Sequence, residues 1–276
     1  MSQSLLKSIA VWAISNGLRL PQLPLDRVNE LAFLRDLLLR LKIDCVLDVG
    51  ANRGQFASEL RGIGYDGRII SFEPISGEFL ALKDHFKGDL KWSGHQIALG
   101  NKEETKSINI PKLTVMSSLL ESRFAENGVR KELVTVRRLD NILPTLLNGA
   151  ESSRIFLKMD TQGFDLEVFK GASDCIQTIH GIQSELSVQP LYENMPHYLE
   201  ALEAYEAAGF ALHNLSVVNR TASGGLLELN CFMRRADSKP IATGTAVRGI
   251  EIDGPQSIRR SLHTLGAPHL PQGNPV

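Results

Sequence analysis

A glycine turn preceded by an acidic residue is the strongest chemical signal in the sequence. An apolar run leads into the turn through Asp48, and helical periodicity follows the turn residues Gly50, Asn52 and Gly54. Such a turn lets a ligand approach bare backbone, and the helix that follows offers unpaired N–H groups with a partial positive charge. The arrangement predicts a small-molecule site at this turn.

The next apolar run ends in Phe72, Glu73 and Pro74. In a doubly wound sheet this strand end would lie beside the glycine turn, at the carboxyl edge where ligands bind. A carboxylate there can accept hydrogen bonds from both hydroxyls of a ribose, so we predict that Glu73 anchors a nucleoside. Ala98, near the end of the third apolar run, would pass beside the adenine.

The residue types of the turn indicate which nucleoside cofactor fits. A dinucleotide site uses three glycines to admit a pyrophosphate, whereas Asn52 takes the middle position here. Asp48 adds negative charge where the pyrophosphate would lie. A cationic sulfonium with an amino-acid tail suits these residues better, because Asp48 can pair with its ammonium directly or through water. The alternatives are a nicotinamide-dependent oxidoreductase and a non-catalytic nucleoside-binding module.

Three further residues could remove a proton from an acceptor. Asp160 follows Lys158 at the end of an apolar run and Glu185 ends the next run, so both carboxylates are predicted at one sheet edge, with Lys158 as an ion-pair partner. Neighbouring carboxylates raise each other's pKa and can share a proton or a cation. His213 is the best imidazole candidate. We predict base function in the order Asp160, Glu185, His213; the alternatives are a helix cap, a buried ion pair and a structural histidine.

Composition narrows the classes of partner. The 276 residues carry 30 basic and 31 acidic side chains, so no global field favours nucleic acid. Cys45, Cys175 and Cys231 stand in apolar runs without the spacing of a zinc site or a disulfide framework, which predicts reduced thiols in the core. No apolar run approaches the ~20 residues of a bilayer span and residues 1–20 lack the pattern of a signal peptide, so the expected location is the cytoplasm. We predict no metal site, with a divalent cation across Asp160 and Glu185 as a secondary alternative.

The elements that must position these residues alternate between strand and helix patterns. Strands are predicted at 45–49, 68–73, 95–99, 155–160, 181–186, 211–218 and 226–234, and helices at 26–41, 54–63, 77–86, 164–170 and 197–208. This alternation predicts an α/β fold with a mostly parallel seven-stranded sheet. The turn formers at 219–225 predict that the last two strands form an antiparallel hairpin. Further candidates are strands at 107–110 and 133–137 and a helix or lid at 121–128.

Three segments are expected along the chain. Residues 1–41 would form an N-terminal helical extension, residues 42–236 the main domain, and residues 237–276, rich in Pro and Gly, a flexible tail. Residues 5–18 show the spacing of an amphipathic helix that lies across the domain. Peripheral contact with a membrane surface is the alternative for this helix.

Several separated motifs resemble the FkbM family of methyltransferases. They are VLDVGANRGQF at 46–56, FEP at 72–74, LKMDTQG at 157–163, and the shorter stretches 98–100, 117–119, 138–140, 167–172, 185 and 191–192. The resemblance covers residues 44–235 and implies a Rossmann-like class I methyltransferase fold, S-adenosyl-L-methionine as cofactor and methyl transfer to oxygen, commonly on sugars. Members more usually carry Glu where this chain has Gln162, so no acid–base role carries over to that position.

The combined prediction is an S-adenosylmethionine-dependent O-methyltransferase that acts on a hydroxyl of a sugar, a glycolipid or another natural product. The predicted cofactor-binding residues are Asp48, Gly50, Asn52, Gly54, Phe72, Glu73, Pro74 and Ala98. The residues leave open whether the acceptor is lipid-linked or free.

Overall fold

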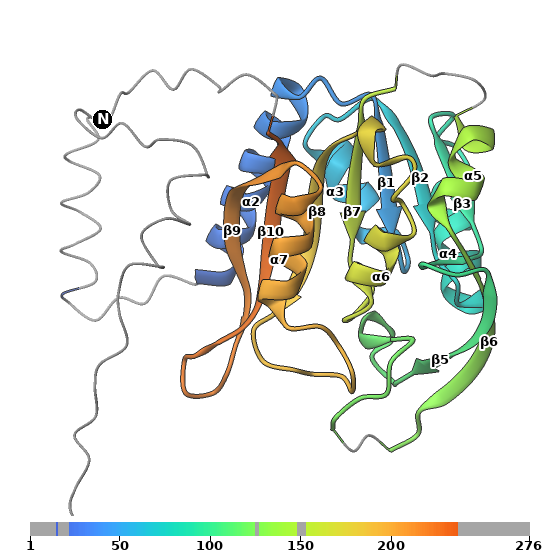
Figure 1. The fold of residues 1–276 in the computed structure, drawn as a ribbon, viewed down its shortest axis with the longest axis vertical. Coiled ribbons are helices and arrows are strands. Elements are labelled where there is room, and N and C mark those ends of the chain that lie inside the picture. Colours follow the sequence, from blue (N-terminus) through green and yellow to red (C-terminus); the bar gives the residue numbers. More distant parts are fainter. Residues whose placement is uncertain (1–14, 16–21, 125–126, 148–152, 237–276) are drawn as a thin grey trace, which may run out of the picture. The chain divides into compact units, whose positions relative to one another are not determined.

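Seven of the short apolar runs form one central sheet in the computed structural model, which describes residue 15 and residues 22–124, 127–147 and 153–236. The strands are β1 (Cys45–Val49), β2 (Arg68–Phe72), β3 (Trp92–His95), β7 (Ile155–Met159), β8 (Ile179–Ser187), β9 (Phe210–Arg220) and β10 (Leu226–Arg235). Their order in the sheet is β3-β2-β1-β7-β8-β10-β9 (Figure 1).

The direction of the strands follows from their composition and connections. The strands from β3 to β8 pair in parallel, and all five residues of the central strand β1 are buried, as expected where helices cover both faces of a sheet. A turn at residues 221–225 joins β9 to β10, which pairs antiparallel with both β9 and β8. The predicted mostly parallel sheet that ends in an antiparallel hairpin is therefore confirmed.

Helices lie on the two faces of this sheet and divide the core in two. They are α2 (Gln22–Arg40), α3 (Gln55–Gly62), α4 (Ser76–His85), α5 (Leu139–Leu146), α6 (Asp165–Lys170) and α7 (Tyr198–Ala207), with short 3-10 turns at Thr114–Met116 and Ile176–Thr178. Buried side chains of α2, α3 and α4 pack with Val46, Phe156 and Phe232. Those of α5, α6 and α7 pack with Leu47 and Leu157, which point to the opposite face.

The third predicted strand, at 95–99, is wrong, because the chain leaves the central sheet partway along this segment. β3 ends at His95, and Ala98–Leu99 forms β4, which pairs with β6 in a separate three-stranded sheet of order β4-β6-β5. The other two strands of this sheet are β5 (Glu104–Ile110) and β6 (Arg130–Arg137), as predicted from residues 107–110 and 133–137. Figure 1 shows β5 and β6 at the end of the domain opposite the β9–β10 hairpin. The second sheet thus brings Ala98 to the edge where β1 and β2 end.

The middle of the chain holds one helix that was not predicted and one segment whose helix prediction is wrong. Helix α5 was not among the predicted elements; it contains Pro144, which has no backbone N–H to donate within the helix. The described residues between 121 and 128 form turns and an isolated bridge rather than a helix, and the alternative given for this segment, a lid, stays a prediction.

The N-terminal region contributes to the core through α2. Its residues Leu34, Leu37, Leu38 and Leu41, which we assigned to an extension, are 1–3% exposed. The predicted helix at 5–18, apart from Ser15, and the predicted tail at 237–276 lie outside the described residues. Within the described part of the chain, no helix has the length and apolarity needed to span a membrane.

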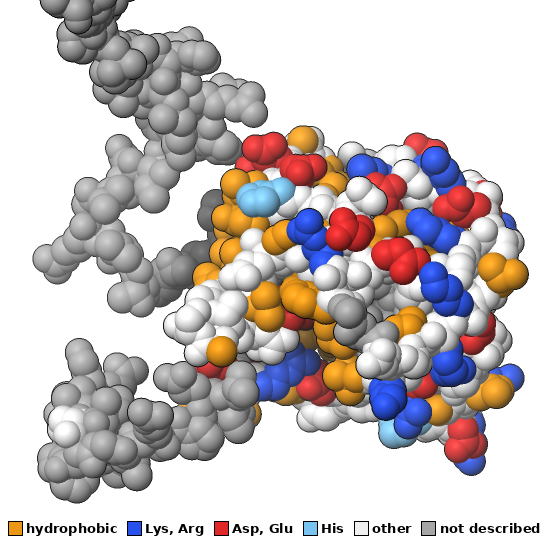
Figure 2. All heavy atoms as spheres, turned by 90° about the horizontal axis from the view of Figure 1, so that it is seen from below, with side chains coloured by type: hydrophobic (Ala, Val, Ile, Leu, Met, Phe, Trp, Pro, Cys, Tyr) orange, Lys and Arg blue, Asp and Glu red, His pale blue; other side chains and the backbone are white. Residues whose placement is uncertain are grey.

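The molecular surface carries charges of both signs. In Figure 2, which views the domain from below relative to Figure 1, acidic and basic side chains alternate over much of the visible face, and apolar side chains gather near its middle. This face presents no extended single-signed field to a partner.

We expect α2 to be required for the stability of the domain. Leu37→Ala removes a side chain that is 1% exposed and should lower the free energy of unfolding, measured by urea denaturation, by ~2–5 kcal/mol. Leu39→Ala, on the 64% exposed side of the same helix, should change it by less than ~0.5 kcal/mol. Equal effects of the two variants would show that α2 does not belong to the core.

Candidate functional site

The turn after β1 is built on a glycine that contacts another strand end. Gly50 has φ +75°, and a Cβ at this position would lie 2.0 Å from the carbonyl oxygen of Asp160. The N–H groups of Gly50 and Ala51 both donate to the Phe72 carbonyl at 3.0 Å. The turn therefore joins the ends of β1, β2 and β7, and only glycine fits at its first position.

Gly54 lies on the side of this turn that packs against Phe86 and Leu82. It has φ +91° and precedes α3, and a Cβ there would lie 2.5 Å from the Phe86 ring. Gly54 allows α3 to begin close to α4, and it does not line the cavity described below. Its left-handed backbone agrees with the predicted role of Gly54 in shaping the turn, and its part in cofactor binding stays a prediction.

Glu73 is a buried carboxylate held by two backbone groups. The N–H of Asn52 donates to Oε2 and the N–H of Ile75 to Oε1, each at 2.8 Å, while the residue is 4% exposed. Burial raises the pKa of Glu73 to about 7, and the two backbone hydrogen bonds only partly oppose this shift. Each carboxylate oxygen keeps a second lone pair for a ligand.

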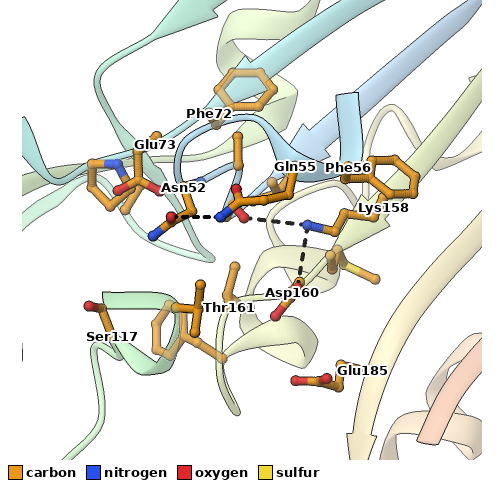
Figure 3. Close-up of a pocket in the computed structure, with 18 of the residues that line it drawn as sticks. Asn52, Gln55, Phe56, Phe72, Glu73, Ser117, Lys158, Asp160, Thr161 and Glu185 are labelled. Atoms are coloured by element: carbon orange, nitrogen blue, oxygen red, sulfur yellow. Dashed lines mark hydrogen bonds and ion pairs between the residues drawn. The ribbon is translucent and has the colours of Figure 1, made fainter. Parts of the chain in front are cut away.

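A cavity of about 290 Å³ lies at this edge of the sheet. Six of the eight predicted cofactor residues line it, namely Gly50, Asn52, Phe72, Glu73, Pro74 and Ala98. In Figure 3, Glu73 lies on one side of the cavity and Asp160 and Glu185 lie on the other. The structure therefore brings the proposed nucleoside anchor and the two carboxylates into one space.

Asp48 is buried and forms an ion pair with Lys158, which lines the cavity. The Lys158 ammonium is 3.1 Å from Asp48 and 3.6 Å from Asp160, and it donates to the Gly50 carbonyl at 3.4 Å. Burial opposes the charge, but the two carboxylates outweigh it and raise the pKa of Lys158. Asp48 is fully buried and is not among the residues that line the cavity. Its predicted pairing with the cofactor ammonium, directly or through water, stays a prediction.

Gln162 links the carboxylates of Asp160 and Glu185. Its amide nitrogen donates to Asp160 Oδ1 at 3.1 Å and to Glu185 Oε2 at 2.8 Å, and its oxygen accepts from the Tyr192 hydroxyl at 2.8 Å. Gln162 is buried at φ +52°, and its carbonyl accepts from Ser118 at 2.7 Å. The amide thus fixes the separation of Asp160 and Glu185.

Asp165, in the first turn of α6, fixes the same two strand ends from the other side. It accepts from the Thr161 N–H at 2.8 Å, from the Ser184 hydroxyl at 2.8 Å and from the Glu185 N–H at 3.1 Å. Burial raises the pKa of Glu185 well above its usual value, and Asp160, Glu228 and Asp165 add to the rise while Lys158 opposes it.

The structure does not bring His213 to the cavity. Its ring lies 5.6 Å from that of Phe33 on α2, in the first half of β9, and it is not among the residues that line the cavity. Because β9 runs parallel to β8, this half of β9 is away from the carboxyl edge of β8. The alternative interpretation, a structural sheet histidine, agrees with this position.

Several cavity residues were missed by the sequence analysis. They are Arg27, Gln55, Phe56, Glu59, Thr114, Gln183, Val218 and Asn230. The alternation along β8 could have indicated Gln183, because it shares a face with Glu185 two residues later. Gln55 and Phe56 close the motif at 46–56 and directly follow the glycine turn, so their place in the sequence could also have indicated them. Arg27 and Asn230 depend on how α2 and β10 pack against the sheet, and no local signal marks them.

Among the residues that the structure describes, no three His, Cys, Asp or Glu side chains are grouped closely enough to hold a metal ion. The three cysteines are free thiols, and Cys45 and Cys231 are buried.

Comparison with known proteins decides the family. The methyltransferase FkbM domain matches residues 48–212, which is more than half of the chain. The chain belongs to the FkbM methyltransferase family. S-Adenosylmethionine is thus the expected methyl donor, and the strand order given above is the Rossmann-like one predicted for the family. No curated protein sequence matches the chain.

Solved methyltransferase structures are similar at low sequence identity. Magnesium protoporphyrin IX methyltransferase of Synechocystis PCC 6803, solved with bound S-adenosylmethionine, has a TM-score of 0.44 and 7% identity over 76% of this chain and 80% of that chain. The 1,6-didemethyltoxoflavin-N1-methyltransferase of Burkholderia thailandensis has a TM-score of 0.41 and 14% identity over 85% and 88%.

We expect the Lys158–Asp48 pair to stabilise the fold only as a pair. Lys158→Met leaves the buried Asp48 without a partner and should lower the free energy of unfolding by ~3–5 kcal/mol, whereas adding Asp48→Asn should restore most of it. Lys170→Met, at an exposed pair with Glu167, is the control and should cost less than ~1 kcal/mol. Chemical denaturation of five proteins tests this: the unmodified protein, Lys158→Met, Asp48→Asn, the double variant and Lys170→Met. Additive effects of Lys158→Met and Asp48→Asn would contradict it.

Proposed function

We propose that this protein transfers the methyl group of S-adenosylmethionine to a hydroxyl of a sugar, a glycolipid or another natural product. The observation that carries the proposal is that a nucleoside-type anchor, Glu73, and a linked pair of carboxylates open into one cavity in a chain of the FkbM family. An oxidoreductase would not need paired carboxylates at this position.

The residues on the β2 side of the cavity fit the methyl donor. Glu73 offers free lone pairs for ribose hydroxyls, Ala98 gives a flat apolar wall for adenine, and the left-handed turn at Gly50 and Asn52 leaves its backbone open to a ligand. Asp160, with its side chain 40% exposed, faces the cavity and can pair with a cationic group.

The acceptor must lose a proton and be aligned for attack. The sulfonium of S-adenosylmethionine supplies an already electrophilic methyl group, so the protein contributes mainly alignment and a base. Glu185 now precedes Asp160 as the candidate, because the raised pKa of Glu185 makes it the stronger base while Asp160 is paired with Lys158. Asp160 then orients the donor or the acceptor.

Gln162 is a positioning residue in this proposal. Because both amide hydrogens bind carboxylates, Asp160 and Glu185 can lie close together without a shared proton or a metal ion. A glutamate at this position would add a third negative charge. The Gln162 amide therefore positions the two carboxylates, in place of the acid–base role that a glutamate could have at this position.

Methyl transfer is expected to depend on Glu185. With methyl-labelled S-adenosylmethionine and a panel of hydroxylated acceptors, Glu185→Gln should reduce kcat by roughly 10²–10⁴-fold, because a glutamine cannot accept the proton. Glu193→Gln, at an exposed ion pair with Arg123, is the matched control and should retain activity. Absence of label transfer by the unmodified protein, or full activity of Glu185→Gln, would contradict the proposal.

Cofactor affinity is expected to rise with pH. Burial raises the pKa of Glu73 to about 7, so the carboxylate that accepts ribose hydroxyls is mostly protonated at pH 6 and mostly ionised at pH 8. If the ionised form binds, the Kd for S-adenosylhomocysteine from calorimetry should fall by about tenfold between these values. Glu73→Gln should remove this dependence. Equal slopes for both proteins would show that Glu73 does not hold the ribose.

A further inference from the structure

The cavity extends beyond the part that a nucleoside would fill. Its walls come from the ends of β2, β1, β7, β8 and β10, and four strand spacings of ~4.8 Å give a width of about 19 Å. We name its far side the β8–β10 wall, formed by Gln183 and Glu185 of β8, Val218 of β9 and Asn230 of β10. This wall is separated from Glu73 by the ends of β1 and β7.

Gln183 is a buried amide without a partner in this wall. It is 4% exposed, its Oε1 is buried without a hydrogen bond, and its side chain makes no hydrogen bond to any residue that the structure describes. In the sheet it stands between Lys158 and Phe232. A buried carbonyl with no donor reduces stability. Its position is explained if a ligand with a hydrogen-bond donor enters the cavity.

Charges around the wall are predominantly negative. Arg27 forms ion pairs with both Glu30 and Glu59. The distance from its Nε to Glu59 Oε1 is 3.0 Å. Asn230 donates to both Glu30 oxygens at 3.1 Å. Lys158 is paired with Asp48 and Asp160, so both cations that line this part of the cavity are neutralised. Glu185 adds a further carboxylate.

From this arrangement we propose that the β8–β10 wall is the acceptor subsite, and that it takes an uncharged, hydroxyl-bearing ring with one hydroxyl donating to the Gln183 carbonyl. The inference rests on the proposed function, since it places the acceptor opposite the donor. Glu185 lies two residues from Gln183 on the same strand face, so a hydroxyl next to the one bound by Gln183 reaches the base. Phosphate or carboxylate groups on this ring are excluded by the surrounding carboxylates.

The subsite can be tested with the protein saturated with S-adenosylhomocysteine. The probes are neutral methyl hexopyranosides and their uronate and 6-phosphate counterparts, with binding measured by ligand-observed NMR titration. At least one neutral glycoside should bind more tightly than its anionic counterparts, and Gln183→Leu should weaken that binding about three- to tenfold. Gln189→Leu, an exposed position after β8, is the control.

Two further readouts separate binding from folding. The Kd for S-adenosylhomocysteine should be the same in Gln183→Leu and the unmodified protein, and the urea midpoint of Gln183→Leu should be equal or higher, because the variant removes an unpaired buried carbonyl. Gln183→Glu keeps an acceptor oxygen and should recover glycoside binding to within about threefold.

The proposal is overturned if no neutral glycoside is preferred, or if Gln183→Leu binds it unchanged. Loss of S-adenosylhomocysteine binding in the unmodified protein would instead overturn the proposed function.

Discussion

One buried ammonium holds the central strands and the site together. The Lys158 ammonium lies 3.1 Å from the carboxylate of Asp48 on β1 and 3.6 Å from that of Asp160, which follows β7. It also donates a hydrogen bond to the backbone carbonyl of Gly50 in the turn. A buried charge is tolerated only when its partners are in place. The geometry of the turn after β1 and the position of the Asp160 carboxylate therefore depend on the same group.

The Glu73 side of the cavity could be predicted from the sequence because its signals are local. A buried five-residue strand, a turn with left-handed residues and a carboxylate at the next strand end lie within 30 residues, and their relative placement follows from the parallel pairing of β1 and β2. The hairpin that ends the sheet was predictable for the same reason, since a short link of turn formers joins its strands.

The side of the cavity formed by β8, β9, β10 and α2 could not be predicted, because it depends on packing between distant segments. Arg27 and Asn230 are some 200 residues apart and meet through Glu30, and no periodicity marks such a contact. Sequence position also misled us at His213, whose distance from the edge depends on the register of β9. Asp48 and Gly54 match the motif, but the structure shows them supporting the cavity from behind rather than lining it.

The matched family domain and the cavity do not have the same boundaries. The family match covers residues 48–212, whereas Arg27, Val218 and Asn230 stand outside it and line the cavity. Residues of α2, β9 and β10 thus reach the cavity from outside the stretch that the family model matches. A comparison of FkbM proteins over the matched stretch alone would therefore leave out part of the wall of this cavity.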